Sequence, residues 1–229
     1  MQEKLIIVGI SSTSKQILNF VNHYRLYDVI GFAVNKAYMN VEEFQGLPVY
    51  ALETLQNTYS PTDYKLFVAV QWNHLNRDRK TLYNYCKSHG FQMANIISPT
   101  AIVRSPIEVD NLFIDDYAVI MNDVTLGNNC YFKVSCVIGS NAVISEHCFC
   151  GIKSLIGGGS IIGEQSFVGL NATIFDGTTI GRKCLVGACA VVKRNMPDFS
   201  KWATSSDIVI KQYTEDEIEE KLVTSKNVR

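Results

Sequence analysis

The sequence predicts a small α/β domain followed by a parallel β-helix and a short C-terminal helix. Three observations predict this arrangement. Residues 114–197 repeat with a period of six, strand and helix patterns alternate before residue 98, and a capping-box sequence follows residue 213. A six-residue period suits neither a helix nor a single alternating strand, and it is typical of a coil of short strands with a bend in every block.

The repeat consists of fourteen consecutive six-residue blocks without an insertion. Twelve of the fourteen leading residues are aliphatic, and eleven of the fourteen fifth residues are Ala, Ser or Cys. One large and one small inward residue per block would fill a narrow interior, so three blocks, or 18 residues, predict one turn of a triangular prism. The second residue is Gly in eight blocks, and we expect it to supply backbone angles that other residues avoid at the bends.

The N-terminal region alternates strand and helix patterns. Strands are predicted at residues 4–9, 28–34, 65–70 and 91–97, with a short edge strand at 47–49, and helices at 17–24, 51–57 and 75–89. Such alternation predicts a small, Rossmann-like parallel sheet covered by helices. The expected domains are 1–97 for the α/β part, 98–212 for the β-helix, and 213–229 for the C-terminal helix and tail, with Ser98-Pro99 at the first boundary.

The composition argues against a nucleic-acid-binding protein and against a membrane-spanning one. The net charge of −1 predicts no nucleic-acid partner, and no apolar run is long enough for a membrane span. The N-terminus lacks a signal-peptide pattern, and the odd count of seven Cys, mostly at inward positions, predicts reduced thiols and a cytoplasmic protein. A metal site at His147, Cys148 and Cys150 is not expected, because adjacent strand residues point to opposite faces.

The six-residue phase, the N-terminal α/β domain and the Ser98-Pro99 junction together resemble one family. It comprises the nucleotide-sugar N- and O-acyltransferases of the left-handed β-helix superfamily, including bacillosamine N-acetyltransferases and sialic acid O-acetyltransferase-like proteins. The resemblance implies a left-handed parallel β-helix, a homotrimer with active sites between neighbouring prisms, and acetyl-CoA or another acyl-CoA as co-substrate. It also implies a nucleotide-sugar acceptor and a role in surface-polysaccharide or glycan biosynthesis.

The resemblance places a general base at the third residue of an Ile-Gly-His block. In this chain Ser140 stands at that position, and Asn141 stands where the family has the partner of the base. The positions of a second family histidine hold Phe149 or Lys153. His147, at a bend of its block, is open to three interpretations: a solvated bend residue, a substitute base that a neutral imidazole would suit at pH 7, or a trimer contact.

Two stretches of the repeat resemble the acyl-CoA site of the family. Gly158 corresponds to a glycine whose backbone N–H is offered to the thioester oxygen, where a fixed donor stabilises developing negative charge. The alternative is that the run of glycines around it only relaxes a bend. Gly187 and Ala188 resemble the groove for the pantetheine arm, and Lys193 is a candidate phosphate partner. For the cation, a plain solvated face is the alternative.

The N-terminal domain supplies the expected nucleotide-sugar contacts. Gly9, Ser11 and Ser12 replace the glycine-rich phosphate loop of the family, and their hydroxyls would donate at a helix N-terminus. Asn35 stands where the family has an acidic residue that contacts the base. Trp72 is expected to stack on a base or sugar, and Arg77, or Arg79 nearby, to pair with a diphosphate.

Two functions follow from these residues. The first is acyl transfer, specifically acetyl transfer, from acyl-CoA to an amino group of a nucleotide-linked sugar, by an enzyme that lacks the usual histidine base. An amine acceptor is favoured because a neutral amine is already a competent nucleophile. The alternative is a catalytically degenerate β-helix trimer that acts as a scaffold or binding module, which the replacements at Ser140, Asn141, Phe149 and Lys153 favour together.

Overall fold

The computed structural model describes residues 2–60, 62–203 and 210–221. It divides into two compact units. The N-terminal unit comprises the residues up to Gln71 together with Thr81–Ile96, and the prism comprises Trp72–Lys80 and the chain from Ile97 on. The break after Ile96 lies next to the expected junction, whereas the grouping of Trp72–Lys80 with the prism is not visible in the sequence pattern.

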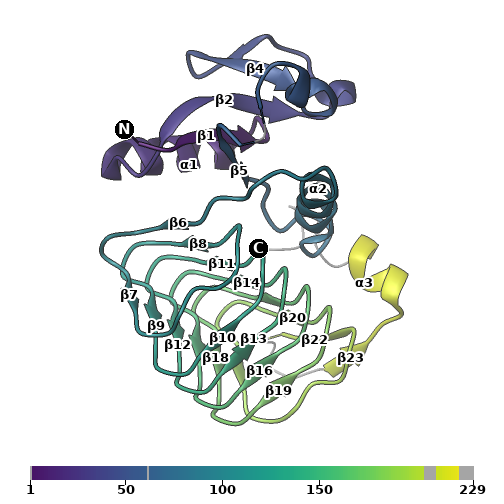
Figure 1. Ribbon diagram of the computed structural model, residues 1–229. Coiled ribbons are helices and arrows are strands. Elements are labelled where there is room, and N and C mark those ends of the chain that lie inside the picture. The colour runs from purple at the N-terminus through teal and green to yellow at the C-terminus, as the bar shows by residue number, and fades with distance from the viewer. Residues whose placement is uncertain (1, 61, 204–209, 222–229) are drawn as a thin grey trace. The chain divides into compact units, whose positions relative to one another are not determined.

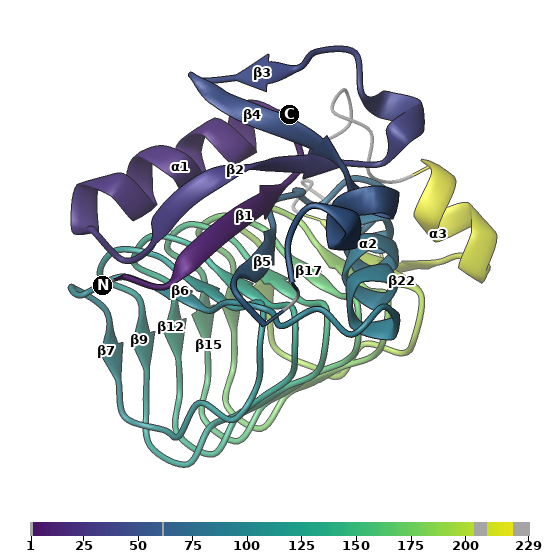
Figure 2. The ribbon, with the colours of Figure 1, turned by 45° about the horizontal axis from the view of Figure 1, so that its top comes forward.

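A mixed sheet forms the N-terminal unit (Figure 2). In the order β3-β4-β2-β1-β5, its strands are β3 (Glu43–Phe44), β4 (Leu47–Ala51), β2 (Asp28–Val34), β1 (Lys4–Val8) and β5 (Lys65–Val68). All pairs are parallel except β3 with β4. Leu5 to Val8 are fully buried, as expected of a parallel strand covered on both faces. The helices are α1 (Ser12–Tyr24), η1 (Lys36–Tyr38), η2 (Leu52–Asn57) and α2 (Arg77–Ser88).

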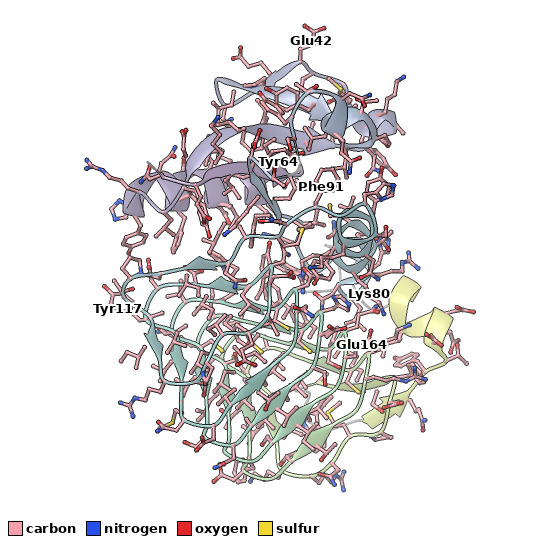
Figure 3. The ribbon with its side chains drawn as sticks, in the orientation of Figure 1. Glu42, Tyr64, Lys80, Phe91, Tyr117 and Glu164 are labelled. Atoms are coloured by element: carbon pink, nitrogen blue, oxygen red, sulfur yellow. The ribbon has the colours of Figure 1, made fainter. Side chains whose placement is uncertain are left out.

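Two strand predictions for this unit are wrong. The strand at 47–49 is not at the edge, because β3 pairs with it on its outer side. Residues 91–97 do not form one strand: Met93 makes an isolated bridge to Leu66, and Ile96–Ile97 form the separate strand β6. Phe91 instead turns its ring into the core, 6.2 Å from that of Tyr64 (Figure 3).

The prism is a stack of short strands, most of two residues, in three sheets that are parallel except where β23 pairs with β22 (Figure 1). The β12 sheet contains β7 (Ile102–Val103), β9 (Val119–Ile120), β12 (Val137–Ile138), β15 (Leu155–Ile156), β18 (Thr173–Ile174) and β21 (Val191–Val192). The β13 sheet contains β10 (Thr125–Leu126), β13 (Val143–Ile144), β16 (Ile161–Ile162) and β19 (Thr179–Ile180). The β14 sheet contains β6, β8 (Phe113–Ile114), β11 (Tyr131–Phe132), β14 (Phe149–Cys150), β17 (Phe167–Val168), β20 (Leu185–Val186), β22 (Ser200–Trp202) and β23 (Ile210–Gln212). The chain then forms α3 (Glu215–Lys221).

The register confirms three blocks per turn. Val137 pairs with Val119 and with Leu155, each 18 residues away. Leading and fifth residues are buried together in one core, as with Ile138 and Ala142. The cysteines at inward positions are free thiols within this core. None of the helices in the described ranges is both long and apolar enough to cross a lipid bilayer.

Glycine has a different role in the repeat from the one expected. The left-handed backbone angle falls on the fourth residue of every block except the last, as at Asn141 (φ 61°) and His147 (φ 63°), and not on the second-position glycine. A Cβ added at Gly139 would lie 2.5 Å from the backbone nitrogen of Gly158 on the next turn. Gly139 is therefore glycine because the adjacent turn stacks too closely there for a side chain.

The three corners of the prism are named here by the sheet that each follows. Corner 1 follows the β12 sheet and includes residues 139–142. Corner 2 follows the β13 sheet and includes residues 145–148. Corner 3 follows the β14 sheet and includes residues 151–154. Residues 18 apart stack at the same corner, so the corner decides which of the predicted site residues can meet within one chain.

Candidate functional site

Corner 1 carries a groove of about 570 Å³. Its walls are mostly apolar and include Val137, Leu155 and Phe175, while Ser140 and Gly158 contribute a hydroxyl and an exposed piece of backbone. The glycines of this corner keep its backbone accessible. The nearest atoms to a Cβ added at Gly158 would be the Ser140 carbonyl oxygen, at 3.1 Å, the Asp176 Oδ1 atom, at 3.8 Å, and the Ser140 backbone nitrogen, at 3.9 Å. A flat group can therefore approach the backbone here.

Three third-position residues, Ser140, Gly158 and Asp176, form a column along the groove. The backbone N–H of Gly158, expected to face a thioester oxygen, donates instead to the Asp176 Oδ1 atom at 2.7 Å. Asn141 lies beside the column, with its backbone N–H donated to the carbonyl of Asn122. Sequence reasoning missed Asp176, although its place 36 residues after Ser140, two turns of 18, puts it in the same column.

Lys193 lies near this groove. Its Nζ atom is 5.4 Å from the centre of the Phe175 ring, and Phe175 forms part of the groove wall. A cation over an aromatic face is attracted by the ring quadrupole, so Phe175 favours one location for this otherwise exposed side chain. The structure thus brings Lys193 together with Ser140, Asn141 and Gly158 at corner 1.

His147 lies at corner 2, and its interpretation as a solvated bend residue is wrong. It is only 2% exposed, and its Nδ1 atom is 2.9 Å from the amide nitrogen of Asn129. Burial, together with the positive charges of Lys80 and Arg79, lowers the pKa of His147 to about 4. The imidazole is neutral at pH 7, but within one chain it faces a different corner from the groove.

The segment Trp72–Lys80 accounts for this burial. Arg79 is fully buried and its Nη2 donates to the carbonyls of His147 and Cys148, both at 3.0 Å. Its guanidinium also lies 4.5 Å from the centre of the Tyr131 ring. Lys80 pairs with Glu164 at 2.6 Å (Figure 3). Arg79 therefore holds the prism backbone, and its expected pairing with a diphosphate is wrong.

Trp72 packs against two phenylalanines of the prism, and its stacking on a base or sugar stays a prediction. Its ring packs edge-on against Phe149, with centroids 5.1 Å apart, and is tilted against Phe167 at 5.8 Å. Phe149 is itself buried, so it blocks no groove at corner 1. Arg77 opens α2 in the same segment, and its pairing with a diphosphate stays a prediction.

Corner 3 holds the remaining acyl-CoA candidates. Gly187 and Ala188 follow β20 at this corner, as Lys153 does after β14. A Cβ added at Gly187 would lie 3.3 Å from the Trp202 carbonyl oxygen, a tight contact that the neighbouring turn would have to relax slightly to accommodate. Within one chain the structure does not bring these residues to the groove, so a site that uses both corners needs a second copy.

The nucleotide candidates of the N-terminal unit cluster at the carboxyl ends of β1 and β2. Gly9 adopts a φ of 121°, and a Cβ there would lie 3.0 Å from the Ser14 hydroxyl. The Ser11 hydroxyl caps α1 by accepting from the N–H of Ser14 at 3.4 Å, while Ser12 is exposed at the first turn. These donors suit an anion at a helix N-terminus, although the helix itself uses the hydroxyl of Ser11.

An acidic residue that sequence reasoning missed lies at the end of β2. Glu53, from η2, accepts from the side-chain amide of Asn35 at 3.3 Å and from the backbone N–H of Lys36 at 2.8 Å. A carboxylate is thus present beside Asn35 although none follows β2 in sequence. The described residues contain no group of three His, Cys, Asp or Glu side chains arranged to hold a metal ion.

Comparisons with known proteins agree with this architecture. Residues 159–194 match the model of the hexapeptide repeat of succinyl-transferase. Perosamine N-acetyltransferase from Caulobacter crescentus, in a histidine-to-asparagine variant with CoA and GDP-perosamine, is 24% identical, with 92% of this chain and 97% of that chain covered and a TM-score of 0.79. PerB from the same organism, in complex with CoA and GDP-perosamine, is 25% identical over 91% of this chain and 97% of that chain, with a TM-score of 0.56.

The acetyltransferase domain of PglB from Neisseria gonorrhoeae is 23% identical, with 88% of this chain and 97% of that chain covered and a TM-score of 0.77. No curated protein sequence matches the chain. These likenesses confirm the predicted fold class, an α/β domain followed by a left-handed parallel β-helix. The chain carries the hexapeptide repeat and shares the fold of these sugar acetyltransferases over nearly its whole length.

Proposed function

We propose that the chain transfers an acyl group, in the first instance acetyl, from acyl-CoA to an amino group of a nucleotide-linked sugar. The observation that carries this proposal is the groove of corner 1, in which apolar walls surround the Ser140 hydroxyl and an unobstructed backbone at Gly158. Relatives that share the fold over 97% of their own length are described with CoA and GDP-perosamine bound.

The groove fits a thioester by its shape and lining. Bound acyl-CoA would supply an activated acyl carbon, and the apolar side chains of Val137, Leu155 and Phe175 would exclude water from it. Because Gly158 has no side chain, the backbone allows close approach. The Ser140 hydroxyl can donate a hydrogen bond to a developing oxyanion, and Lys193 lies close enough to Phe175 to meet a phosphate at the rim.

The absence of a histidine at corner 1 favours an amine over a hydroxyl acceptor. A general base is worth roughly 10²–10⁴-fold in rate, and Ser140 cannot act as one near pH 7. A neutral amine attacks without prior deprotonation and loses its proton later to the departing sulfur. The catalytic contribution of the chain is then mainly proximity and fixed dipoles.

A catalytically degenerate scaffold or binding module is the second candidate. Two observations favour it: the buried, corner-2 location of His147 and the engagement of the Gly158 N–H by Asp176. In this case the groove would still bind ligands. The variant of the Caulobacter crescentus relative that lacks a histidine is described with both CoA and GDP-perosamine, so ligand binding does not by itself distinguish the two candidates.

Release of free thiol from acetyl-CoA distinguishes them. The full chain is incubated with acetyl-CoA and a panel of UDP-, dTDP- and GDP-linked amino sugars, GDP-perosamine included, and thiol is measured over time. Acceptor-dependent thiol release with formation of an amide product is the expected result. Saturable binding of CoA and a sugar nucleotide without thiol release by any member of the panel would favour the scaffold.

The proposed site requires a second copy of the chain. Corner 3, with Gly187 and Ala188, and corner 1, with Ser140 and Gly158, lie on different edges of one prism, and a trimer of prisms would bring corners of different copies together. Sedimentation should therefore give a homotrimer. A monomer at assay concentration would remove Gly187 and Ala188 from the site.

A further inference from the structure

Asp176 supplies the single charge of the groove. The other described side chains that line it are aliphatic, aromatic, hydroxyl-bearing or sulfur-containing, or belong to glycine. A carboxylate in apolar surroundings attracts a cation or a hydrogen-bond donor. The acceptor of the proposed reaction carries such a group in its amine.

The charge of Asp176 is not needed for the hydrogen bond that it makes. Elsewhere in the prism the neutral amide of Asn128 makes an equivalent contact, in which its Oδ1 accepts from the backbone N–H of Asp110 at 3.0 Å. Both Asn128 and Asp176 are third residues of their blocks, and each bonds to the preceding turn. An asparagine at position 176 would therefore stack equally well.

Asp198 is a further carboxylate that accepts a backbone hydrogen bond in this way, but it also has a cationic partner. Asp198 accepts from the backbone N–H of Arg182 at 2.9 Å, and its second oxygen pairs with the Arg182 guanidinium, also at 2.9 Å. For Asp176 no ion pair forms within the described ranges of the chain. Its Oδ1 accepts from Gly158, which leaves Oδ2 able to accept further hydrogen bonds.

We propose that the carboxylate of Asp176 binds the amino group of the acceptor sugar and makes the site selective for amines over hydroxyls. This inference rests on the proposed acyl transfer and adds a residue to it. Asp176 is two turns from Ser140 in the same column, and Gly158 between them has no side chain to intervene. An amine held by Asp176 thus lies along the open face of the Gly158 backbone.

In this reaction Asp176 acts only as a hydrogen-bond acceptor and takes no proton. An ammonium held by Asp176 first releases one proton to water; the neutral amine nitrogen then bonds to the acyl carbon, the carbon–sulfur bond breaks, and the further proton lost by nitrogen leaves with the thiol. A carboxylate favours an ammonium or amine donor through a charge-assisted hydrogen bond. A hydroxyl acceptor lacks the positive charge, so the same contact contributes less to its binding.

The test compares Asp176→Asn with the unchanged chain. The asparagine keeps an oxygen for the Gly158 N–H, as Asn128 does for Asp110, and so preserves the stacking. Asp123→Asn is the matched control, because it removes one carboxylate from an exposed position of corner 1 outside the groove. For each form, calorimetry measures binding of GDP-, UDP- and dTDP-linked amino sugars and of the matched compounds with a hydroxyl in place of the amine. Thiol release gives KM and kcat.

We expect Asp176→Asn to weaken binding of the amino sugar, and raise its KM, at least tenfold. Binding of the hydroxyl compound and the KM for acetyl-CoA should change less than twofold, and Asp123→Asn should leave all of these values unchanged.

Equal loss of binding for the amine and hydroxyl compounds, or no loss for either, would overturn the inference, while thiol release would still support the proposed function. An amine preference that depends on Asp176 in a chain without thiol release would support the inference and refute the transferase. Absence of amine preference and of thiol release would refute both.

Discussion

Corners 1 and 2 of the prism are built from the same six-residue repeat, yet one is open and the other is closed. Corner 1 presents a groove with Ser140, Gly158 and the unpaired charge of Asp176. At corner 2, the segment Trp72–Lys80 covers the bends, and Arg79 satisfies two backbone carbonyls there. The leading and fifth residues of the blocks are buried at both corners. The corners therefore differ in their outward-facing residues and in the segment that covers one of them.

The comparison teaches that the repeat determines the column and that outward residues determine which side of it is accessible. The presence of a histidine in the repeat does not by itself make that histidine a catalytic group. His147 occupies a bend position like that of Asn141, with φ angles of 63° and 61°, but Arg79 and Asn129 hold it inside the protein. The predictions below test this contrast, from the largest expected effect to the smallest.

Removal of Arg79 should open the closed corner. We expect Arg79→Met to lower the free energy of unfolding by about 3 kcal/mol, because the carbonyls of His147 and Cys148 lose a charged donor and the Tyr131 ring loses its cation. Urea unfolding measures the change, with exposed Arg104→Met as the control. If stability is unchanged or greater, the cost of burying the guanidinium outweighs its contacts.

Acid should destabilise the closed corner through His147. Its native pKa of about 4 lies below the ordinary value of 6.5, so the unfolded chain binds a proton between these values that the native chain does not. Stability contributed by the neutral imidazole is present above pH 6.5 and is lost as the pH falls towards 4, by about 2–3 kcal/mol.

The variant His147→Asn separates the contribution of His147 to the loss of stability in acid from the contribution of the carboxylates. Urea unfolding at pH 7.5 and pH 4.5 should show a smaller loss for His147→Asn than for the unchanged chain. The same loss in both chains would show that His147 titrates normally in the folded protein, contrary to its buried environment.

Two glycines of corner 1 should respond differently to alanine. At Gly139 a Cβ would lie 2.5 Å from the nitrogen of Gly158, so Gly139→Ala should cost about 1–3 kcal/mol of stability. At Gly158 the nearest atom is the Ser140 oxygen at 3.1 Å, so Gly158→Ala should cost about 1 kcal/mol or less but reduce thiol release, since its methyl group enters the groove. Thermal unfolding and the thiol assay measure the two effects. Similar unfolding temperatures for the two variants would argue against the stacking role of Gly139.

A base introduced at the open corner should have the smallest effect. Ser140→His places an imidazole in the groove and should raise thiol release with hydroxyl acceptors by about tenfold, the low end of what general base catalysis contributes. Asn122→His, one turn earlier in the same column, is the control. A gain for both variants, or for neither, would argue against a missing base at Ser140.

Most of the fold was predictable because its signal is local and repeated. The inward pair of each block, such as Ile138 with Ala142, identified the core and the three-block turn. The strand at 91–97 was not predictable in the same way, because Phe91 uses its ring in the core of the N-terminal unit and only Met93 reaches the neighbouring strand. The place of Glu53 beside Asn35 depends on a contact across 18 residues that no short pattern encodes.

The candidate site was predictable in part. Ser140, Asn141 and Gly158 were assigned through the resemblance to the family, and counting in eighteens from Ser140 through Gly158 would also have found Asp176. The burial of His147 and the packing of Trp72 were beyond such counting, because both depend on a segment that lies more than thirty residues before the repeat.

By itself the sequence determined that the chain coils into a three-sided column, because large and small inward residues recur in phase every six residues. Only the tertiary structure decided which edge of that column is accessible. That outcome depends on where Trp72–Lys80 docks and on how Arg79 satisfies buried carbonyls, and these are interactions between distant residues that follow no period.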